Sequence, residues 1–162
     1  MFGEWMYAKH TVFYDSLPDY FMEFDIFDRE NGVFLDTPSR RAITDKLKIV
    51  SSVPVLSTGV FTKKEQILSL LKNSNFITAN HIENLKEQAR KYNQNEERAL
   101  KETDPSMLME GLYIKVEENG EVKGRYKFVR ASFLQCVNLS EGHWQSRPII
   151  PNVLKNDKKY YF

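Results

Sequence analysis

The segment MLMEGLYIKVEENGEVKGRYKFVR, residues 107–130, decides the fold, because two apolar-rich runs flank the dipeptide Asn119-Gly120. Asn-Gly between such runs is the strongest short signal for a β-hairpin, since a type I′ turn requires positive φ at both central residues. A two-residue loop also determines which residues of the two strands face each other. The expected pairs are Glu118 with Glu121, Leu112 with Lys127, and Glu110 with Val129.

Charged residues of this hairpin are predicted to gather on one side. Side chains of a strand alternate between the two faces of a sheet, and cross-strand partners share a face. This alternation places Glu110, Arg125 and Lys127 on one face and pairs Tyr113 with Tyr126 on the other. One acid and two bases on a rigid ribbon suit a polyanion and a divalent metal ion. The alternative is a solvated charged face without a chemical role.

Composition indicates one globular domain without a strong overall charge. The chain has 162 residues, of which 41% are hydrophobic and 13% aromatic, enough to bury a core. Its net charge of +1 exerts no general attraction on nucleic acid, so such binding would need a local patch. Cys136 is the single cysteine, which fits a reducing compartment. No apolar run approaches the about 20 residues of a membrane span. We therefore expect a soluble, cytoplasmic protein.

Strand-like segments cluster toward the two ends of the chain, around a helical middle. Strands are expected over residues 2–14, 20–28, 33–35 and 49–56. Helices are expected over residues 37–48, from a capping box at 62–65, over 80–92, near 93–102 and over 132–139. Within 20–28, alternation puts Phe24 on one face and Asp25 on the other. This order predicts a single α+β domain, 1–162, with antiparallel sheets and packed helices.

Several common catalytic signatures are missing from the sequence. It has no CxxC or HExxH metal motif, no Ser-His-Asp signature and no phosphate-binding glycine loop. The three histidines, His10, His81 and His143, are far apart in the chain. We therefore predict structural or surface positions for them.

Four short motifs occur in a particular order: FGEW at 2–5, MEFDIFD at 22–28, EGLYIK at 110–115 and RYKFVR at 125–130. They resemble motifs III, IIIa, IV and V of the covalent nucleotidyltransferases, and within that superfamily the ATP-dependent RNA ligases of bacteria and phages. AKHTVFYDSLP, ETDPSMLMEGLYIKVEE and HWQSRPIIPN are similar to the same family, so the resemblance covers the whole chain. It implies an ATP-grasp-like ligase domain that uses ATP and Mg²⁺ or Mn²⁺. Such enzymes join RNA 3′-hydroxyl and 5′-phosphate ends through an enzyme–AMP intermediate.

The resemblance implies roles for individual acids and aromatic residues. Glu4 matches the motif III acid, which contacts the ribose of the nucleotide. Phe24 matches the aromatic residue of motif IIIa that stacks on adenine, and Asp25 is the acid beside it. Glu110 matches the motif IV acid, which is associated with the divalent metal ion and with the later steps of ligation.

Three bases complete the implied site. Lys127 matches the second base of motif V, which contacts the nucleotide phosphate. Arg125 stands where the family has lysine, a change that keeps the charge and alters the geometry. Lys115 closes motif IV, but in a plain strand it faces away from Glu110, so a bulge near Gly111 would be needed to bring it in. The implied catalytic set is Asp25, Glu110 and Lys127, and the nucleotide-binding set is Glu4, Phe24, Lys115, Arg125 and Lys127.

The sequence departs from the family at motif I. It contains no Asp-Gly dipeptide and hence no KxDG, whose lysine is the nucleophile that carries AMP. The first match is to motif III, so we expect an incomplete, C-terminal part of a ligase domain that is inactive alone and leaves strand edges open. Two alternatives stay open. The chain could complete a separate N-terminal half that carries KxDG, or it could only bind nucleotide or RNA through a patch of Arg125, Lys127 and Arg130.

Overall fold

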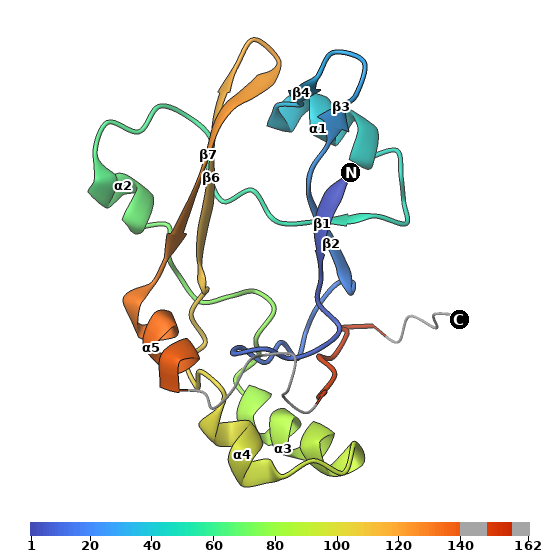
Figure 1. Cartoon of the computed structure of the whole chain (residues 1–162), viewed down its shortest axis with the longest axis vertical. Coiled ribbons are helices and arrows are strands. Elements are labelled where there is room, and N and C mark those ends of the chain that lie inside the picture. Colours follow the sequence, from blue (N-terminus) through green and yellow to red (C-terminus); the bar gives the residue numbers. More distant parts are fainter. Residues whose placement is uncertain (140–148, 157–162) are drawn as a thin grey trace.

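The structure is a computed structural model that describes residues 1–139 and 149–156. A long hairpin stands beside a small sheet; α3, α4 and α5 lie toward the lower end of both, while α1 lies at the upper end (Figure 1). The strands are β1 (Phe2–Trp5), β2 (Phe21–Asp25), β3 (Phe27–Asp28), β4 (Val33–Phe34), β5 (Ser51–Ser52), β6 (Gly111–Glu118) and β7 (Glu121–Val129). The helices are α1 (Thr37–Thr44), α2 (Lys64–Leu68), α3 (His81–Lys91), α4 (Glu96–Lys101) and α5 (Ala131–Leu139). The predicted α+β class is confirmed.

The central hairpin forms as predicted at its turn but not along its length. Asn119 and Gly120 have φ of 54° and 85°, as a type I′ turn requires, and Glu118 pairs with Glu121. Next to the turn the register shifts, because β7 carries one extra residue, Lys123, between the partners of Val116 and Glu117. The pairs beyond this bulge are Gly111 with Val129, Leu112 with Phe128, Tyr113 with Lys127, and Lys115 with Arg125. The predicted pairs Leu112–Lys127 and Glu110–Val129 are therefore wrong.

This shift of one residue changes which side chains share a face. Because the side-chain period of a strand is two, every position of β6 beyond the bulge turns to the other face relative to β7. Tyr113 consequently shares a face with Lys127 rather than with Tyr126, and Lys115 shares it with Arg125. The bulge that brings Lys115 in lies near the turn and not near Gly111.

A second bulge shapes the small sheet, whose strand order is β1-β2-β5. Phe2 pairs with Asp25 and Gly3 with Glu23, which leaves Phe24 as the extra residue of β2. Phe24 and Asp25 can therefore both reach the hairpin, and the prediction that they point to opposite faces is wrong. β5 runs parallel to β2, so the sheets are not all antiparallel as expected.

The buried core lies at the helical end of the molecule. The predicted strand over 2–14 ends at Trp5, and residues 11–17 form an irregular, almost fully buried segment. Phe13 packs there against Leu85 and Ala89 of α3. The segment is hydrogen bonded to residues 149–155 instead of to a sheet: Val153 N donates to Tyr14 O and Leu17 N donates to Val153 O, at 2.8 and 2.9 Å.

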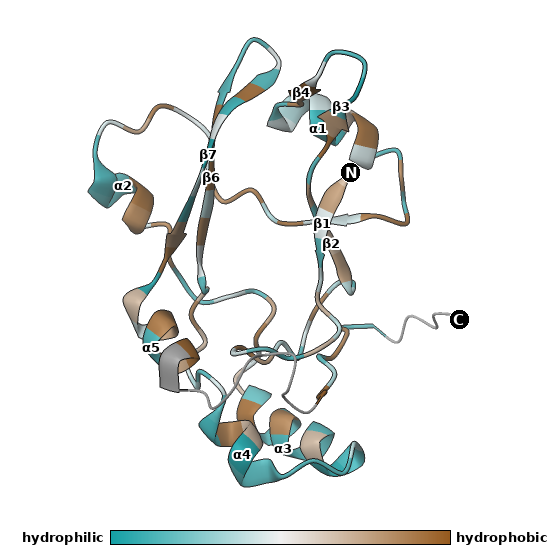
Figure 2. Ribbon diagram, viewed as in Figure 1, coloured by the Kyte–Doolittle hydropathy of each residue, from teal (hydrophilic) through white to brown (hydrophobic). Residues whose placement is uncertain are grey.

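Most helices follow the predicted periodicity. α3, α4 and α5 form where expected, and hydrophobic and hydrophilic residues alternate around α3 as in an amphipathic helix (Figure 2). α1 ends at Thr44, earlier than predicted, and the expected strand over 49–56 shrinks to β5. At α2 the capping acceptor is Gln66 rather than Glu65, because its Oε1 accepts from Lys63 N at 3.1 Å. Among the described residues, no helix is long and apolar enough to cross a membrane.

Candidate nucleotide- and metal-binding site

Asp25 is the point at which the hairpin meets the small sheet. Its carboxylate is buried, with 0% of the residue exposed. Lys115 Nζ lies 2.6 Å from Oδ1, Tyr113 OH donates to Oδ2 at 2.6 Å, and Arg125 Nη1 lies 3.6 Å from Oδ2. Residues that are about ninety positions apart in the chain thus share one carboxylate. Asp25 therefore contacts one base from motif IV, Lys115, and one from motif V, Arg125.

An aromatic pair lies beside these charges. The rings of Phe24 and Tyr113 meet edge to face, with centroids 5.5 Å apart and planes at 67°. Lys115 Nζ donates to Phe24 O at 2.7 Å, so the same lysine anchors the backbone that carries this ring. Burial, then the hydrogen bond to Asp25 and the charge of Asp25, raise the pKa of Tyr113 to about 12. The phenol is therefore protonated and donating at neutral pH.

Arg125 is held by a ring as well as by charge. Its guanidinium lies 3.9 Å from the ring centroid of Phe34, which itself packs against Phe27. The Arg125 side chain is 43% exposed, while the Lys115 side chain is 11% exposed. Stacking on an aromatic face is a use of arginine that lysine reproduces poorly. The substitution at this position of the KxK pattern therefore has a structural partner.

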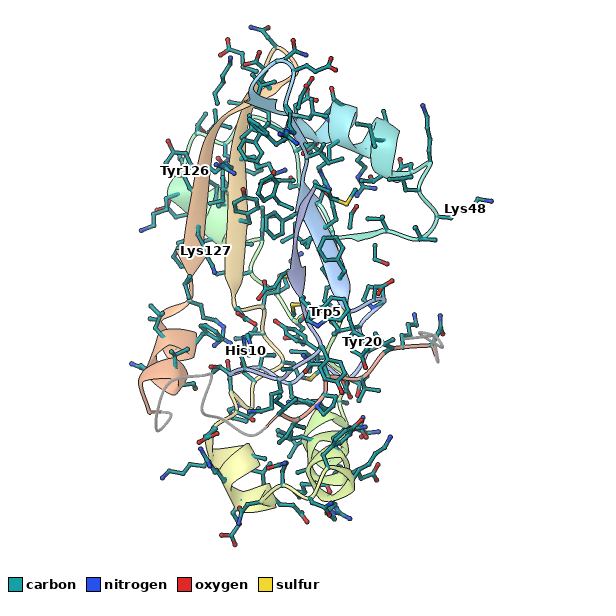
Figure 3. All side chains as sticks on the ribbon, turned by 45° about the vertical axis from the view of Figure 1, so that its right-hand side comes forward. Trp5, His10, Tyr20, Lys48, Tyr126 and Lys127 are labelled. Carbon is teal, nitrogen blue, oxygen red and sulfur yellow. The ribbon has the colours of Figure 1, made fainter. Side chains whose placement is uncertain are left out.

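Glu110 lies just before β6 and forms a second group of charges. Tyr14 OH donates to Glu110 Oε1 at 2.5 Å. Burial raises the pKa of Glu110; the hydrogen bond from Tyr14 lowers it, the charge of Glu4 raises it, and Lys127 and His10 lower it. Figure 3 shows Lys127 on β7 and His10 near the foot of the hairpin. Glu4 of β1 and Glu110, just before β6, are thus close enough to Lys127 of β7 for their charges to interact.

Arg130 is part of the scaffold under this group. It is 8% exposed, its guanidinium forms an ion pair with Asp104, and its Nη1 donates to Ser132 Oγ at 2.6 Å. Its Nε donates to Met109 O at 2.8 Å, and its backbone N donates to Glu110 O at 3.0 Å. The expectation that Arg130 joins a surface patch for RNA is therefore wrong. Its side chain is buried, and it is hydrogen bonded to the backbone just before β6.

Two residues of the site were missed from the sequence, Tyr113 and Tyr14. The predicted hairpin register turns Tyr113 to the wrong face, and the predicted strand over 2–14 includes Tyr14 without giving it a partner. The middle of EGLYIK could have drawn attention to Tyr113, since it stands between Glu110 and Lys115. Nothing in the sequence pairs Tyr14 with Glu110, because 96 positions separate them.

His81 is structural, as predicted. It is 4% exposed, and its ring nitrogens lie 2.9 Å from Thr78 O and 3.2 Å from Pro105 O. His143 lies outside the described residues.

The donors suit a nucleotide and a metal ion that share ligands. Among the described residues, no three His, Cys, Asp or Glu side chains are grouped so that they could hold a metal by themselves. Mg²⁺ is usually held by one or two carboxylates together with substrate phosphates and water. Glu110, with Glu4 nearby, could supply the carboxylates, and Lys115, Arg125 and Lys127 could contact phosphate oxygens.

The raised pKa of Glu110 predicts how Glu110→Gln changes stability with pH. A carboxyl whose pKa is higher in the folded protein binds more protons when folded, so its contribution to stability falls as the pH rises through the interval between its unfolded and folded values. Glutamine does not ionise and can still accept from Tyr14.

We therefore expect urea unfolding between pH 4 and pH 8 to show that Glu110→Gln gains stability relative to the natural chain as the pH rises. A constant difference between the two proteins across this range would contradict the expectation.

Comparison with known proteins identifies the family of the chain. The RNA ligase family model matches residues 1–129 of the 162, and the chain belongs to that family. Its members are ligases and generally use ATP and a divalent metal ion, and membership points to RNA as a substrate. Neither the curated proteins nor the solved structures contain a significant match to the chain.

Proposed function

We propose that this chain is the nucleotide- and metal-binding part of an ATP-dependent RNA ligase that joins 3′-hydroxyl and 5′-phosphate ends. The observation that carries the proposal is the convergence of Lys115 and Arg125 on Asp25, next to the ring of Phe24. Nucleotidyl transfer develops negative charge on phosphate oxygens, and fixed cations stabilise such charge. ATP would supply the adenylyl group and Mg²⁺ or Mn²⁺ would neutralise phosphate charge.

The chain's own residues would bind and orient these groups. Phe24 offers a ring for the adenine, with Tyr113 packed against its edge. Glu4 would contact the ribose, and Lys127 would contact the phosphate. Asp25 would hold Lys115 and Arg125 in place before the nucleotide arrives, so that little reorganisation is needed on binding.

The covalent step needs a lysine that this sequence does not contain in a KxDG context. In that step the lysine amine bonds to the α-phosphorus of ATP while pyrophosphate leaves. We propose that this chain by itself binds ATP without forming enzyme–AMP. Incubation with α-labelled ATP, followed by denaturation, is expected to leave no label on the protein. Label retained after denaturation would overturn this part of the proposal.

ATP binding can be tested at Lys127. Loss of one charge-assisted hydrogen bond typically costs about 1.5–3 kcal/mol, so we expect Lys127→Ala to weaken ATP binding about 10- to 100-fold in titration calorimetry. The matched control is Lys123→Ala in the same strand, since Lys123 pairs with the exposed Glu121 at 2.5 Å. Equal affinities for the two variants would count against a phosphate site at Lys127.

A second candidate is a half enzyme that is completed by another polypeptide carrying KxDG. The observation that favours it is the position of β1 at the edge of the three-stranded sheet, with Phe2 49% and Trp5 54% exposed. An open edge can accept a further strand. Mixing the chain with such a polypeptide would then restore labelling by AMP on the added half. Binding of RNA alone is less favoured, because Arg130 is buried and leaves only Arg125 and Lys127 of the expected patch.

A further inference from the structure

We propose that Tyr14 is a positioning residue that orients the carboxylate of Glu110 toward a divalent cation. The inference rests on the proposed function, since it takes Glu110 as the metal-binding acid. It adds a residue outside the four motifs, and it says how the carboxylate comes to present one particular oxygen.

The hydrogen bond from Tyr14 gives the two carboxylate oxygens of Glu110 different roles. Tyr14 OH donates to Glu110 Oε1 at 2.5 Å. Within the described ranges, no hydrogen-bond or ion-pair partner is found for Oε2 of Glu110. An oxygen that keeps its lone pairs can ligate a cation, while the bonded oxygen fixes the plane of the carboxylate.

Tyr14 is rigid enough to orient another side chain. It is 9% exposed, and its ring packs against Phe76 with centroids 6.5 Å apart. Its backbone N donates to Asn152 Oδ1 at 2.9 Å, and its carbonyl accepts from Val153 N at 2.8 Å. The two residues that hold the backbone of Tyr14, Asn152 and Val153, lie beyond position 129, where the match to the family model ends.

The backbone around Glu110 is also held in place. Arg130 donates from its N to Glu110 O and from its Nε to Met109 O, at 3.0 and 2.8 Å. With the backbone restrained in this way, the freedom that remains is in the side-chain torsions of Glu110, and these are what a fixed phenol can limit. A glutamate without that contact would sample several rotamers and bind a cation less tightly.

The test is the affinity of the chain for Mn²⁺, measured from the electron paramagnetic resonance signal of the free ion. Partners that orient a metal ligand typically change affinity about 10- to 100-fold. We expect Tyr14→Phe, which keeps the ring and removes the hydroxyl, to weaken Mn²⁺ binding at least about 10-fold. Tyr126→Phe is the matched control. Tyr126 is 61% exposed, and it lies on the face of the hairpin opposite to Lys115 and Arg125. It should bind Mn²⁺ as the natural chain does.

Two further measurements separate the possible failures. ATP affinity in the presence of a chelator reports on the rest of the site and is expected to be unchanged in Tyr14→Phe, which a general loss of structure would not allow. Glu110→Gln is expected to abolish Mn²⁺ binding. Normal Mn²⁺ binding by Glu110→Gln would remove the metal role of Glu110 in the proposed function. If Glu110→Gln loses Mn²⁺ while Tyr14→Phe retains full affinity, the inference about Tyr14 is wrong and the proposed function stands.

A second variant tests the same contact with Tyr14 intact. Glu110→Asp shortens the side chain by one methylene and withdraws the carboxylate from the phenol. We expect weaker Mn²⁺ binding here as well, and unchanged affinity would count against the proposal.

Discussion

Asp25→Asn is expected to lower the free energy of unfolding by about 3 kcal/mol or more, since removing one partner of a buried ion pair typically costs about 3–5 kcal/mol. Asparagine has the same shape and can still accept from Tyr113, but it is neutral. Lys115, whose side chain is 11% exposed, would then lack its counter-charge, and Arg125 would lose its nearest acid. The contact between the hairpin and the small sheet would weaken, although the hydrogen bond from Lys115 to Phe24 O and the packing of Phe24 on Tyr113 would remain.

Urea unfolding at pH 7 measures this loss, and Asp28→Asn is the matched control. Asp28 accepts from Asn31 Nδ2 at 2.7 Å in an exposed turn, a role that asparagine can largely retain. We expect the control to change stability by no more than about 0.5 kcal/mol. Asp25→Asn should also weaken ATP binding, because Lys115 and Arg125 would no longer be held beside Phe24. A loss of stability below about 1 kcal/mol would mean that Asp25 does not join the two parts.

Gly111→Ala is expected to open the hairpin beside Glu110. A Cβ on Gly111 would lie 1.9 Å from Phe128 O, 2.9 Å from Phe128 C and 3.0 Å from Val129 Cα. All three are backbone atoms of the partner strand, so the strands would have to move apart. Overpacking typically costs about 1–3 kcal/mol, and we expect this variant at or beyond the upper end. Mn²⁺ binding should fall with stability, since Glu110 precedes this position directly.

Gly124→Ala is the control for that substitution, because it lies in the same hairpin. The atoms nearest to its Cβ belong to the Tyr126 side chain, at 3.1, 3.3 and 3.5 Å, and that side chain is free to turn on the exposed face. We expect a loss well below that of Gly111→Ala in the same urea titration. Equal losses would show that glycine at position 111 is not required by the close approach of Phe128.

Sequence pattern was enough for the hairpin turn, for most of the helices and for the family. Asn119-Gly120 determines the turn because few other residues adopt positive φ, and the apolar spacing of α3 determines that helix. The four motifs identified the RNA ligase family, which the match over residues 1–129 confirms. The residues proposed for the site stay proposals, although the structure brings Asp25, Lys115 and Arg125 together.

The faces to which the side chains of β2, β6 and β7 point depend on two bulges, and the sequence pattern does not predict either bulge. Lys123 and Phe24 are extra residues in their strands, and each shifts its neighbours by one position. Neither bulge has a signal in the local sequence pattern, and both lie where the two sheets contact each other. Here a carboxylate on one sheet meets bases on the other, and only the shifted registers allow it.

By itself, the sequence determined the hairpin turn and most of the helices, because these depend on residues within one turn or one helical period of each other. It also determined the α+β class and the family, because the order of elements and motifs along the chain can be read without knowing how they pack. The tertiary structure alone decided that Tyr14 meets Glu110, that Asp25 collects Lys115 and Arg125, and that Arg130 is buried. Those contacts join positions 21 to 100 apart, and they form only when the separate elements pack. The physical reason is that hydrogen bonds and ion pairs act over a few ångströms in space, whatever the distance along the chain.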